Sequence, residues 1–343
     1  MNWFIWRQHR KQFLVFLILL ASFAALLIPS GVHFWNTYQH ALTNCAQNPA
    51  VYSCSDLDTT VFGSQLAGLV HVAGVLGTFG LPLLFGLFVG APLVAKEYEE
   101  GTNKLAWTQG ISRHKWLTTK ILWALGTALV YGIALTVLAT WWSRTINTID
   151  QNRFVQGHFE TQGLMPVAYS LFFTAVGILM GAWFRKTLLA FAITFGVFVL
   201  CMASFANWIR PHYMQPIKVT AAMGPNLVDS NIPTGAWVLR RDILDKSGKV
   251  VEDIFPAAPR ECQQVIQGQQ ITNQNGHIIR IKPAPGSGDP IDACLNKAGF
   301  HQLATYQPGY RYWDFQRIEA GIYLSMSALA VGATYWFVLK RDA

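Results

Sequence analysis

Long apolar runs separated by short polar segments dominate the pattern of this chain. Most runs hold about 20 residues or more with hardly any charge, which is the length that an α-helix needs to cross the roughly 30 Å hydrocarbon core of a bilayer. Since every backbone amide in lipid must be satisfied within its own segment, we interpret the runs as transmembrane helices. The six runs lie at residues 13–31, 66–95, 121–142, 164–184, 187–208 and 318–339.

The N-terminal segment, residues 1–12, places Trp3 and Trp6 beside Arg7 and Arg10. This mixture is typical of a helix that lies in the membrane interface, so we expect an elbow helix leading into the first span. The basic residues also resemble the start of a signal peptide. However, the first apolar run is longer than a signal peptide needs and no convincing cleavage site of small residues follows it, which favours an uncleaved span.

Lys and Arg concentrate in alternate polar segments. They occur in residues 1–12, throughout residues 96–120 and at the end of the chain, whereas residues 33–65 contain neither. The positive-inside rule therefore places both termini and residues 96–120 in the cytoplasm. It allows a long basic loop outside, because long loops translocate largely regardless of charge. The formal net charge of +8 follows from this topology and does not indicate a nucleic-acid partner.

These features predict an all-α polytopic membrane protein with a small mixed α/β domain outside the cell. Within that domain, Asn275 and Gly276 predict a hairpin turn, and Asp242 is expected to begin a short helix. Aromatic residues at 310–315 are typical of anchoring at the headgroup level, with substrate contact as the alternative. The expected division is an elbow at 1–12, five spans within 13–208, the outside domain at 209–316, and the last span with a cytoplasmic tail at 317–343.

The cysteines are distributed as an oxidising exterior would require. The chain has 5 of them, and none falls in a predicted cytoplasmic segment. The simplest disulfide pairing joins Cys45 to Cys54 and Cys262 to Cys294, although pairing across the two outside loops stays open. A metal site is the rival interpretation, but the nearby histidines lack the ligand spacing of a zinc site. Cys201 lies within the fifth span, where it is expected to pack.

Small residues punctuate the second and fourth spans. Pro82 and Pro92 are expected to bend the long second span. Two Gly-x-x-x-Gly pairs, at residues 86–90 and 177–181, allow helices to approach closely and are a weak indication of dimerisation.

Ionisable groups are scarce in the spans. His71 lies near the outer end of the second span, where packing is the plainer role and proton relay the alternative. Glu319 is expected to pair with the neighbouring Arg317 at the interface, although an ionisable group at that depth is also a functional candidate. Apart from these, we expect the spans to lack the buried acidic and basic residues of a proton-coupled carrier.

The segment of residues 96–120 is the most informative part of the chain. It is short, charged and amphipathic, and both of its ends run directly into spans. A partner that docks on it would therefore move the spans. The sequence contains no Gly-x-x-x-x-Gly-Lys-[Ser/Thr] loop for ATP, and no His-Glu-x-x-His or Gly-x-Ser-x-Gly motif of a hydrolase. We therefore do not expect an enzyme, and transport would have to draw its energy from a partner.

These features together resemble an ABC-2 type ABC transporter permease. The topology resembles that family over nearly the whole chain, and the resemblance is weak only in the outside loop. Four sequence strings are similar to a subgroup common in actinobacteria. They are residues 6–10 (WRQHR), 97–102 (EYEEGT), 107–113 (WTQGISR) and 306–319 (YQPGYRYWDFQRIE).

The resemblance implies a multi-pass permease in a bacterial plasma membrane that works with two copies of a separate ATP-binding subunit. It implies a second permease copy, as a homodimer or a pair of similar chains. No cofactor would bind this chain directly, since ATP and magnesium would bind the partner. A coupling helix within residues 101–110 would dock on that partner. The residues expected to couple are Glu97, Glu100, Gly101, Thr102, Leu105, Trp107, Gln109 and Arg113.

Export of an amphipathic or hydrophobic substrate, such as a drug, peptide or lipid, is the function that this resemblance favours. The alternative is a membrane sensor or assembly factor whose outside domain binds a ligand. A neighbouring gene for a lone ATP-binding subunit would favour transport, and a neighbouring histidine kinase without one would favour sensing.

Overall fold

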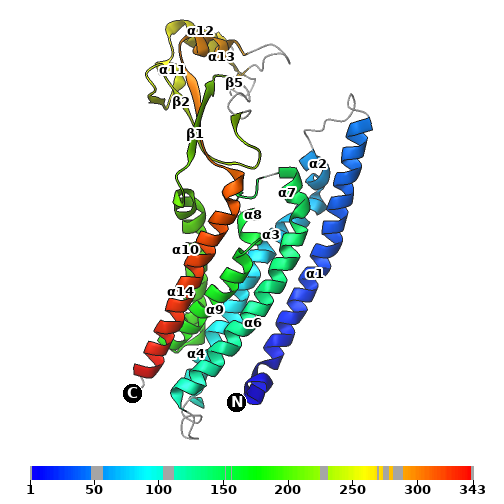
Figure 1. The fold of residues 1–343 in the computed structure, drawn as a ribbon, viewed down its shortest axis with the longest axis vertical. Helices are drawn as coiled ribbons and strands as arrows, with labels where there is room; N and C mark the ends of the chain where they lie inside the picture. Colours follow the sequence, from blue (N-terminus) through cyan, green and yellow to red (C-terminus); the bar gives the residue numbers. More distant parts are fainter. Residues whose placement is uncertain are drawn as a thin grey trace. The chain divides into compact units, whose positions relative to one another are not determined.

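The computed structural model divides the chain into two compact units, which we describe separately. The helical unit comprises Met1–Tyr213 and Tyr312–Ala343, and the sheet unit comprises Met214–Arg311 (Figure 1). The structure describes residues 2–47, 57–102, 112–150, 152–155, 157–224, 231–268, 270–272, 278–280 and 289–340.

The helical unit is a bundle of long helices. Within its described residues, 6 helices are long and apolar enough to cross a membrane. Short elements connect them: α2 (Leu57–Phe62), α7 (Arg144–Asp150), α8 (His158–Thr161) and the 3-10 turn η3 (Arg210–His212). The spans are α1 (Asn2–Gln47), α3 (Gln65–Phe85) continued by the π-helix η1 (Gly86–Gly90) and α4 (Ala91–Glu99), α6 (Arg113–Trp142), α9 (Met165–Phe184), α10 (Thr187–Ser204) continued by the π-helix η2 (Phe205–Ile209), and α14 (Tyr312–Lys340).

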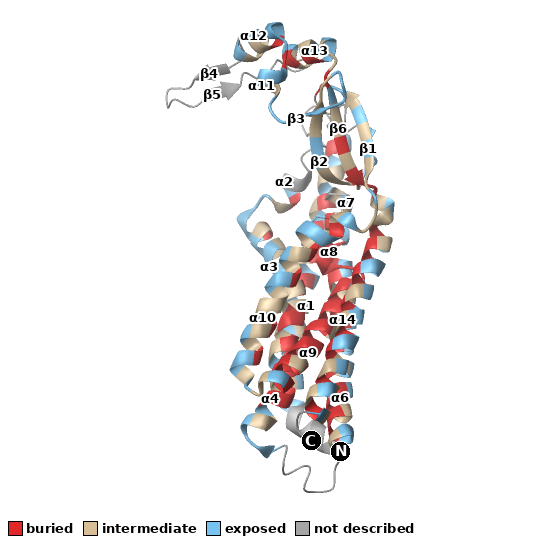
Figure 2. Ribbon diagram, turned by 90° about the vertical axis from the view of Figure 1, so that its left-hand side faces the viewer, coloured by how far each residue is buried: buried red, intermediate tan, exposed pale blue. Residues whose placement is uncertain are grey.

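Helix α9 forms the centre of the bundle. It packs against α3, α4, α6, α10 and α14, and Figure 2 shows it as the most continuously buried helix. Its most apolar window is 72% buried, against 17% for the corresponding window of α1. The other spans therefore present apolar faces outward, as lipid-facing helices do. Helix α1 begins, and α14 ends, at the same end of the bundle (Figure 1), which we call the near end; we call the opposite end the far end.

The first outside segment is more helical than the sequence pattern predicts. Helix α1 runs unbroken from Asn2 to Gln47, so no break separates the predicted elbow from the first span, and the helix continues through residues predicted as a loop. No Gly or Pro interrupts residues 2–28. Beyond the predicted span, Phe34 and Tyr38 lie on the same face as Leu27 and are buried with it. This amphipathic extension is stabilised by packing, which hydropathy alone does not register.

The second span contains a π-helix where the sequence predicts a bend. The element η1 lies between Pro82 and Pro92, and π-turns commonly occur where the regular ladder of a helix is disturbed. A Cβ atom on Gly177 would overlap the carbonyl oxygen of Gly86, and one on Gly90 would lie 2.6 Å from the carbonyl oxygen of Thr174. The two Gly-x-x-x-Gly pairs thus pack against each other within one chain.

In its described residues, the sheet unit contains two antiparallel sheets and three short helices. The larger sheet has the strand order β1-β6-β2-β3, and the smaller one is the hairpin β4-β5. Asp242 lies in the middle of β2, paired with Leu303, so the predicted helix at this position is wrong. The strands are β1 (Ile217–Ala222), β2 (Trp237–Leu244), β3 (Val250–Val251), β4 (Gln270–Thr272), β5 (Ile278–Arg280) and β6 (His301–Gln307); the helices are α11 (Ile254–Ala257), α12 (Arg260–Gly268) and α13 (Pro290–Lys297), and the 3-10 turn η5 (Gly309–Arg311) follows β6.

The position of β2 in the sheet explains the error, because this strand pairs with β6 on one side and with β3 on the other. Central pairing outweighs the weak helical tendency of a few residues. The predicted hairpin is confirmed by the register of Gln270 opposite Arg280 and Thr272 opposite Ile278. Its turn, including Asn275 and Gly276, lies outside the described residues.

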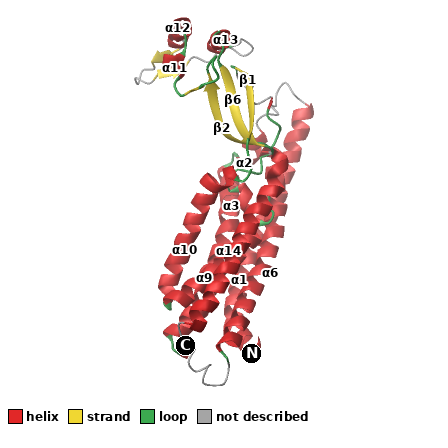
Figure 3. Cartoon of the chain, turned by 60° about the vertical axis from the view of Figure 1, so that its left-hand side comes forward, coloured by secondary structure: helices red, strands yellow, loops and turns green. Residues whose placement is uncertain are grey.

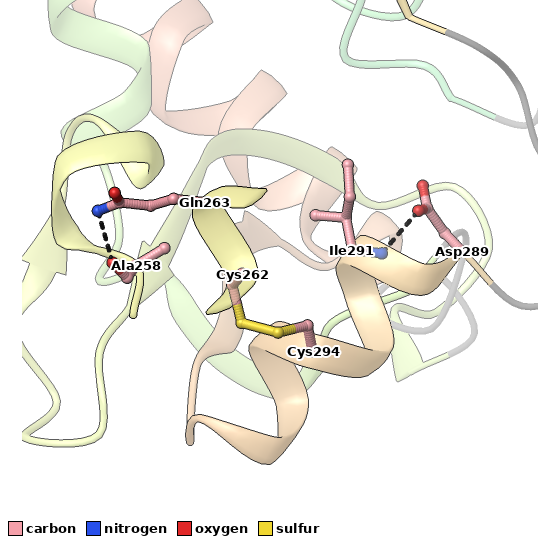
Figure 4. The surroundings of a disulfide bond; sticks show 6 residues. All are labelled: Ala258, Cys262, Gln263, Asp289, Ile291 and Cys294. Atoms are coloured by element: carbon pink, nitrogen blue, oxygen red, sulfur yellow. Dashed lines mark hydrogen bonds between the residues drawn. A yellow bond between two sulfur atoms is a disulfide. The ribbon is translucent and has the colours of Figure 1, made fainter. Parts of the chain in front are cut away.

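A disulfide joins α12 to α13 in the core of the sheet unit (Figure 4). It links Cys262 to Cys294 with a Cα–Cα distance of 5.6 Å, which is the pairing that the sequence favours. Asp289 caps α13, since its Oδ1 accepts a hydrogen bond from the backbone N–H of Ile291 at 2.9 Å. Cys45 is also disulfide-bonded, while its predicted partner Cys54 lies outside the described residues. Cys201 is a buried free thiol.

Candidate functional site

Two helix ends at the near end of the bundle frame the segment that the sequence singles out. Helix α4 ends at Glu99, and the chain then turns at Gly101, whose φ of +71° and open surroundings show that glycine serves the left-handed turn here. Helix α6 begins at Arg113 and is capped by Ser112, whose Oγ accepts a hydrogen bond from the backbone N–H of Lys115 at 3.3 Å. Between them, Thr102 is exposed, and the predicted docking residues Leu105, Trp107 and Gln109 lie outside the described residues.

A buried polar cluster joins the end of α4 to the start of α6. The ammonium group of Lys120 forms an ion pair with Glu97 and donates to the carbonyl oxygen of Leu93 at 3.3 Å. The indole Nε1 of Trp116 donates to the same carboxylate at 3.2 Å, and the Lys120 nitrogen lies 4.9 Å from the centre of that ring. Because a buried charge is costly without its partner, this cluster fixes the spacing of the two helix ends.

A second contact joins α4 to α10. The carboxylate of Glu99 accepts the backbone N–H of Thr187 at 3.0 Å and its hydroxyl at 2.6 Å. Thr187 is the first residue of α10, so the carboxylate satisfies a free N–H at the positive end of that helix. The sequence argument favoured Glu100 instead. That residue is exposed, and within the described part of the chain it pairs with Lys96 of its own helix at 3.7 Å.

Helix α14 completes this near-end arrangement. The phenol of Tyr335 donates to Thr118 Oγ1 of α6 at 2.8 Å, and its ring lies 5.4 Å from the ring of His114. Arg185, which precedes α10, lies 4.8 Å above the ring of Tyr98. We call Glu97, Glu99, Trp116, Lys120 and Thr187 the junction. The junction and the α14 contact together connect α4, α6, α10 and α14. Figure 3 shows that this end of the unit is built of helices.

Glu319 lies in a buried ion triad at the far end of the bundle. Arg210 donates from Nε and Nη2 to the two carboxylate oxygens of Glu319, both at 2.9 Å, and its Nη2 also lies 2.7 Å from Glu160 Oε1. Tyr169 and Tyr213 donate to the Glu319 carboxylate at 3.3 and 3.2 Å. All three charged residues are buried. The triad thus connects three elements: Glu160 lies in α8, Arg210 in η3 after the fifth span, and Glu319 in α14.

The triad corrects one expectation from the sequence. Arg317 does not pair with Glu319 but with Asp314, at 3.6 Å on the exposed surface. Buried charges also lie just outside the predicted runs, since Lys120 near the start of α6 and Arg210 in η3 are buried beside carboxylates. The sequence missed these pairs because the partners are far apart in the chain, 109 residues in the case of Arg210 and Glu319.

His71 lies among aromatic rings near the far end. Its ring is 4.8 Å from that of Phe62, 5.9 Å from that of Trp142 and 5.6 Å from that of His158. This environment suits the packing role. Nothing in it tests proton relay, which stays a prediction.

The aromatic cluster at 310–315 divides between burial and exposure. Tyr312 and Phe315 are buried against Phe154, at ring distances of 5.8 and 5.2 Å, so these two residues are core and not headgroup anchors. Trp313 is exposed, as an interfacial anchor would be. Within the described part of the chain, no group of three His, Cys, Asp or Glu side chains could hold a metal ion.

Comparison with known proteins gives one match. The model of a family described as "ABC-2 membrane transporter related" matches residues 17–210. This stretch is more than half of the chain and contains α4, the start of α6 and Thr187, so the whole junction lies within it. No curated protein and no solved structure matches the chain.

Proposed function

Because the chain belongs to the ABC-2 membrane transporter related family, we propose that it is the membrane-spanning permease subunit of an ABC transporter, driven by a separate ATP-binding subunit. ATP bound with magnesium on that partner supplies the energy. This chain's residues supply the docking surface and the path of movement. We further propose two copies of the ATP-binding subunit and a second permease copy, since closure of a pair of ATPases needs two docking sites.

The junction is the observation that carries this proposal. Both flanks of residues 103–111 are held by polar contacts within a largely apolar bundle: Glu97 to Lys120 on one side of α4 and Glu99 to Thr187 on another. A displacement of the segment therefore moves α4, α6 and α10 together. The tight glycine contact of the second span with α9 would pass that movement to the centre of the bundle.

Export of an amphipathic or hydrophobic substrate is the direction we favour, because the sequence has no signature of an importer permease. The outward-facing apolar surfaces of the spans would let such a substrate partition from the bilayer. We place both termini in the cytoplasm on the distribution of Lys and Arg.

The replacement Trp107→Ala tests the docking claim. A buried Trp truncated at an interface commonly costs about 2 kcal/mol or more, so we expect the ATP-binding subunit to be lost from the purified complex while the permease stays folded. Lys104→Ala should have a smaller effect, since rim charges act mainly on association rate. Co-purification and ATP turnover in proteoliposomes measure both. Wild-type values for Trp107→Ala would remove the coupling assignment, and a membrane sensor would become the better hypothesis.

The replacement Glu99→Ala separates docking from transmission. It removes the contact with Thr187 but does not alter residues 103–111, so the ATP-binding subunit should still co-purify while substrate-stimulated ATP turnover falls severalfold. Thr119→Ala is the matched control, because its hydroxyl donates only to the Lys115 carbonyl of its own helix in the described structure. Equal turnover in the two variants would show that the α4–α10 contact does not transmit the movement.

A further inference from the structure

A cavity at the far end of the helical unit has a chemical character that permease coupling does not explain. Its volume is about 690 Å³. It opens between the end of α6, α7, the start of α9 and the start of α14, at the end of the bundle that lies away from the helix ends carrying the termini (Figure 1). Its lining combines two arginines, Arg144 and Arg153, with the rings of Trp141, Tyr312 and Trp313.

The cavity carries positive charge without a balancing carboxylate. No Asp or Glu is among the described residues that line it, and in the described structure neither arginine forms an ion pair. Each guanidinium instead lies over an aromatic ring: Arg144 at 5.5 Å from that of Trp35 and Arg153 at 5.7 Å from that of Tyr312. Both arginines are exposed, so their donors remain available to a ligand.

Several other polar groups of the lining already have partners, whereas the buried Oγ1 of Thr136 has no hydrogen-bond partner in the described structure. Asn147 and Gln162 donate to each other's side-chain oxygens at 2.7 and 3.0 Å, and Thr140 Oγ1 accepts the backbone N–H of Gly163 at 3.2 Å. The arginines are the charged groups among the described lining residues, and they would therefore recognise an anionic ligand. A guanidinium binds phosphate oxygens through paired N–H donors, and this geometry makes arginine well suited to phosphate.

The rim of the cavity is apolar and lies at the ends of membrane spans. Val137, Trp141, Leu164 and Trp313 line it and are exposed. Tryptophan rings favour the headgroup level of a bilayer, so the arginines lie where headgroups are found, with apolar side chains beside them toward the hydrocarbon. A free anion would use the arginines but would not need this apolar rim.

We propose that this cavity binds the anionic phosphate headgroup of a membrane lipid, with Arg144 and Arg153 on the phosphate and the tryptophans beside the glycerol and upper acyl chains. The site rests on the insertion of the helical unit in a bilayer and does not depend on the ATP-binding partner. Its failure would thus leave the coupling proposal intact, and failure of coupling would leave the lipid site intact.

Native mass spectrometry of the purified full chain tests the proposal, with phosphatidylglycerol and phosphatidylcholine titrated separately into the same detergent. Each arginine near a headgroup contributes roughly a severalfold preference for the anionic lipid, so the pair should give a preference on the order of 30-fold. The double variant Arg144→Gln/Arg153→Gln should lose that preference. Arg317→Gln should keep it, because Arg317 is exposed at the same end but does not line the cavity.

Three results would overturn the proposal: equal binding of the two lipids by the wild type, an unchanged preference in the double variant, or displacement of phosphatidylglycerol by millimolar inorganic phosphate. The last result would assign the cavity to a free anion. Should the double variant fail to fold, the two single variants give the same test, each expected to lose about half of the preference on a logarithmic scale. Thermal unfolding of every variant accompanies the titration.

Discussion

At the scale of single residues, the buried charges are where the sequence and the structure diverge most. The sequence identifies Glu319 as unusual but assigns it to Arg317. Residues two apart on a helix point to nearly opposite sides, so the pair cannot share one face. Arg210, the actual partner, is the first residue of η3, and no local pattern connects it to Glu319. Glu99 and Glu100 likewise point in different directions from the end of α4. Glu99 contacts Thr187 of α10, whereas Glu100 pairs with Lys96.

The far-end triad should be essential for the fold of the helical unit. Arg210→Met leaves Glu160 and Glu319 buried without their cation, so we expect a loss of about 3–5 kcal/mol in stability. Arg317→Gln, which breaks only the exposed pair with Asp314, should cost less than about 1 kcal/mol. Thermal unfolding in detergent measures both. If the charge argument is right, adding Glu319→Gln to Arg210→Met recovers part of the loss; no recovery would mean that lost packing causes the defect.

At the scale of elements, hydropathy predicts the spans well because their boundaries are set by the bilayer. Five of the six predicted runs fall within the observed candidate spans, and the run at 164–184 begins one residue before its span. What hydropathy does not predict is structure held by packing outside the hydrocarbon: the extension of α1 to Gln47 and the short helices α7 and α8. The glycine pairs show a similar limit, since a Gly-x-x-x-Gly pattern predicts close approach but does not name the partner helix.

The glycine contact between the second span and α9 gives a prediction at this scale. In Gly177→Ala the new methyl group would overlap the carbonyl oxygen of Gly86. This oxygen belongs to the helix backbone, so it cannot move aside as the end of a flexible side chain could. We expect a loss of about 1–3 kcal/mol. Gly196→Ala in α10 is the matched control, since no atom lies within 4 Å of its added Cβ. Similar melting temperatures for the two variants would show that the helices can separate slightly at no cost, and the close contact would then not be a rigid link.

At the scale of the whole molecule, two units with separate cores share one chain. The sheet unit is inserted between the fifth and sixth spans and has its own disulfide-linked core. The sequence predicted this insertion from its polar composition and paired cysteines, but it did not predict the strand order, because β1 pairs with β6 from the opposite end of the unit. An even number of spans predicts that the two termini lie on one side of the membrane, and an insertion after the fifth span is predicted on the other side.

The topology can be tested directly with a membrane-impermeant thiol reagent on intact cells and on inverted vesicles. Lys115→Cys places a probe at an exposed position in the first turn of α6, and Ser247→Cys places one at an exposed turn between β2 and β3. The Lys and Arg distribution predicts that Lys115→Cys reacts only in inverted vesicles and Ser247→Cys only in intact cells. The unsubstituted chain is the control, since its free Cys201 is buried and should not react.

Reaction of both probes from one side would contradict the six-span arrangement. Exchange of the two sides would keep the six spans but place the junction outside the cell, where no ATP-binding subunit could reach it.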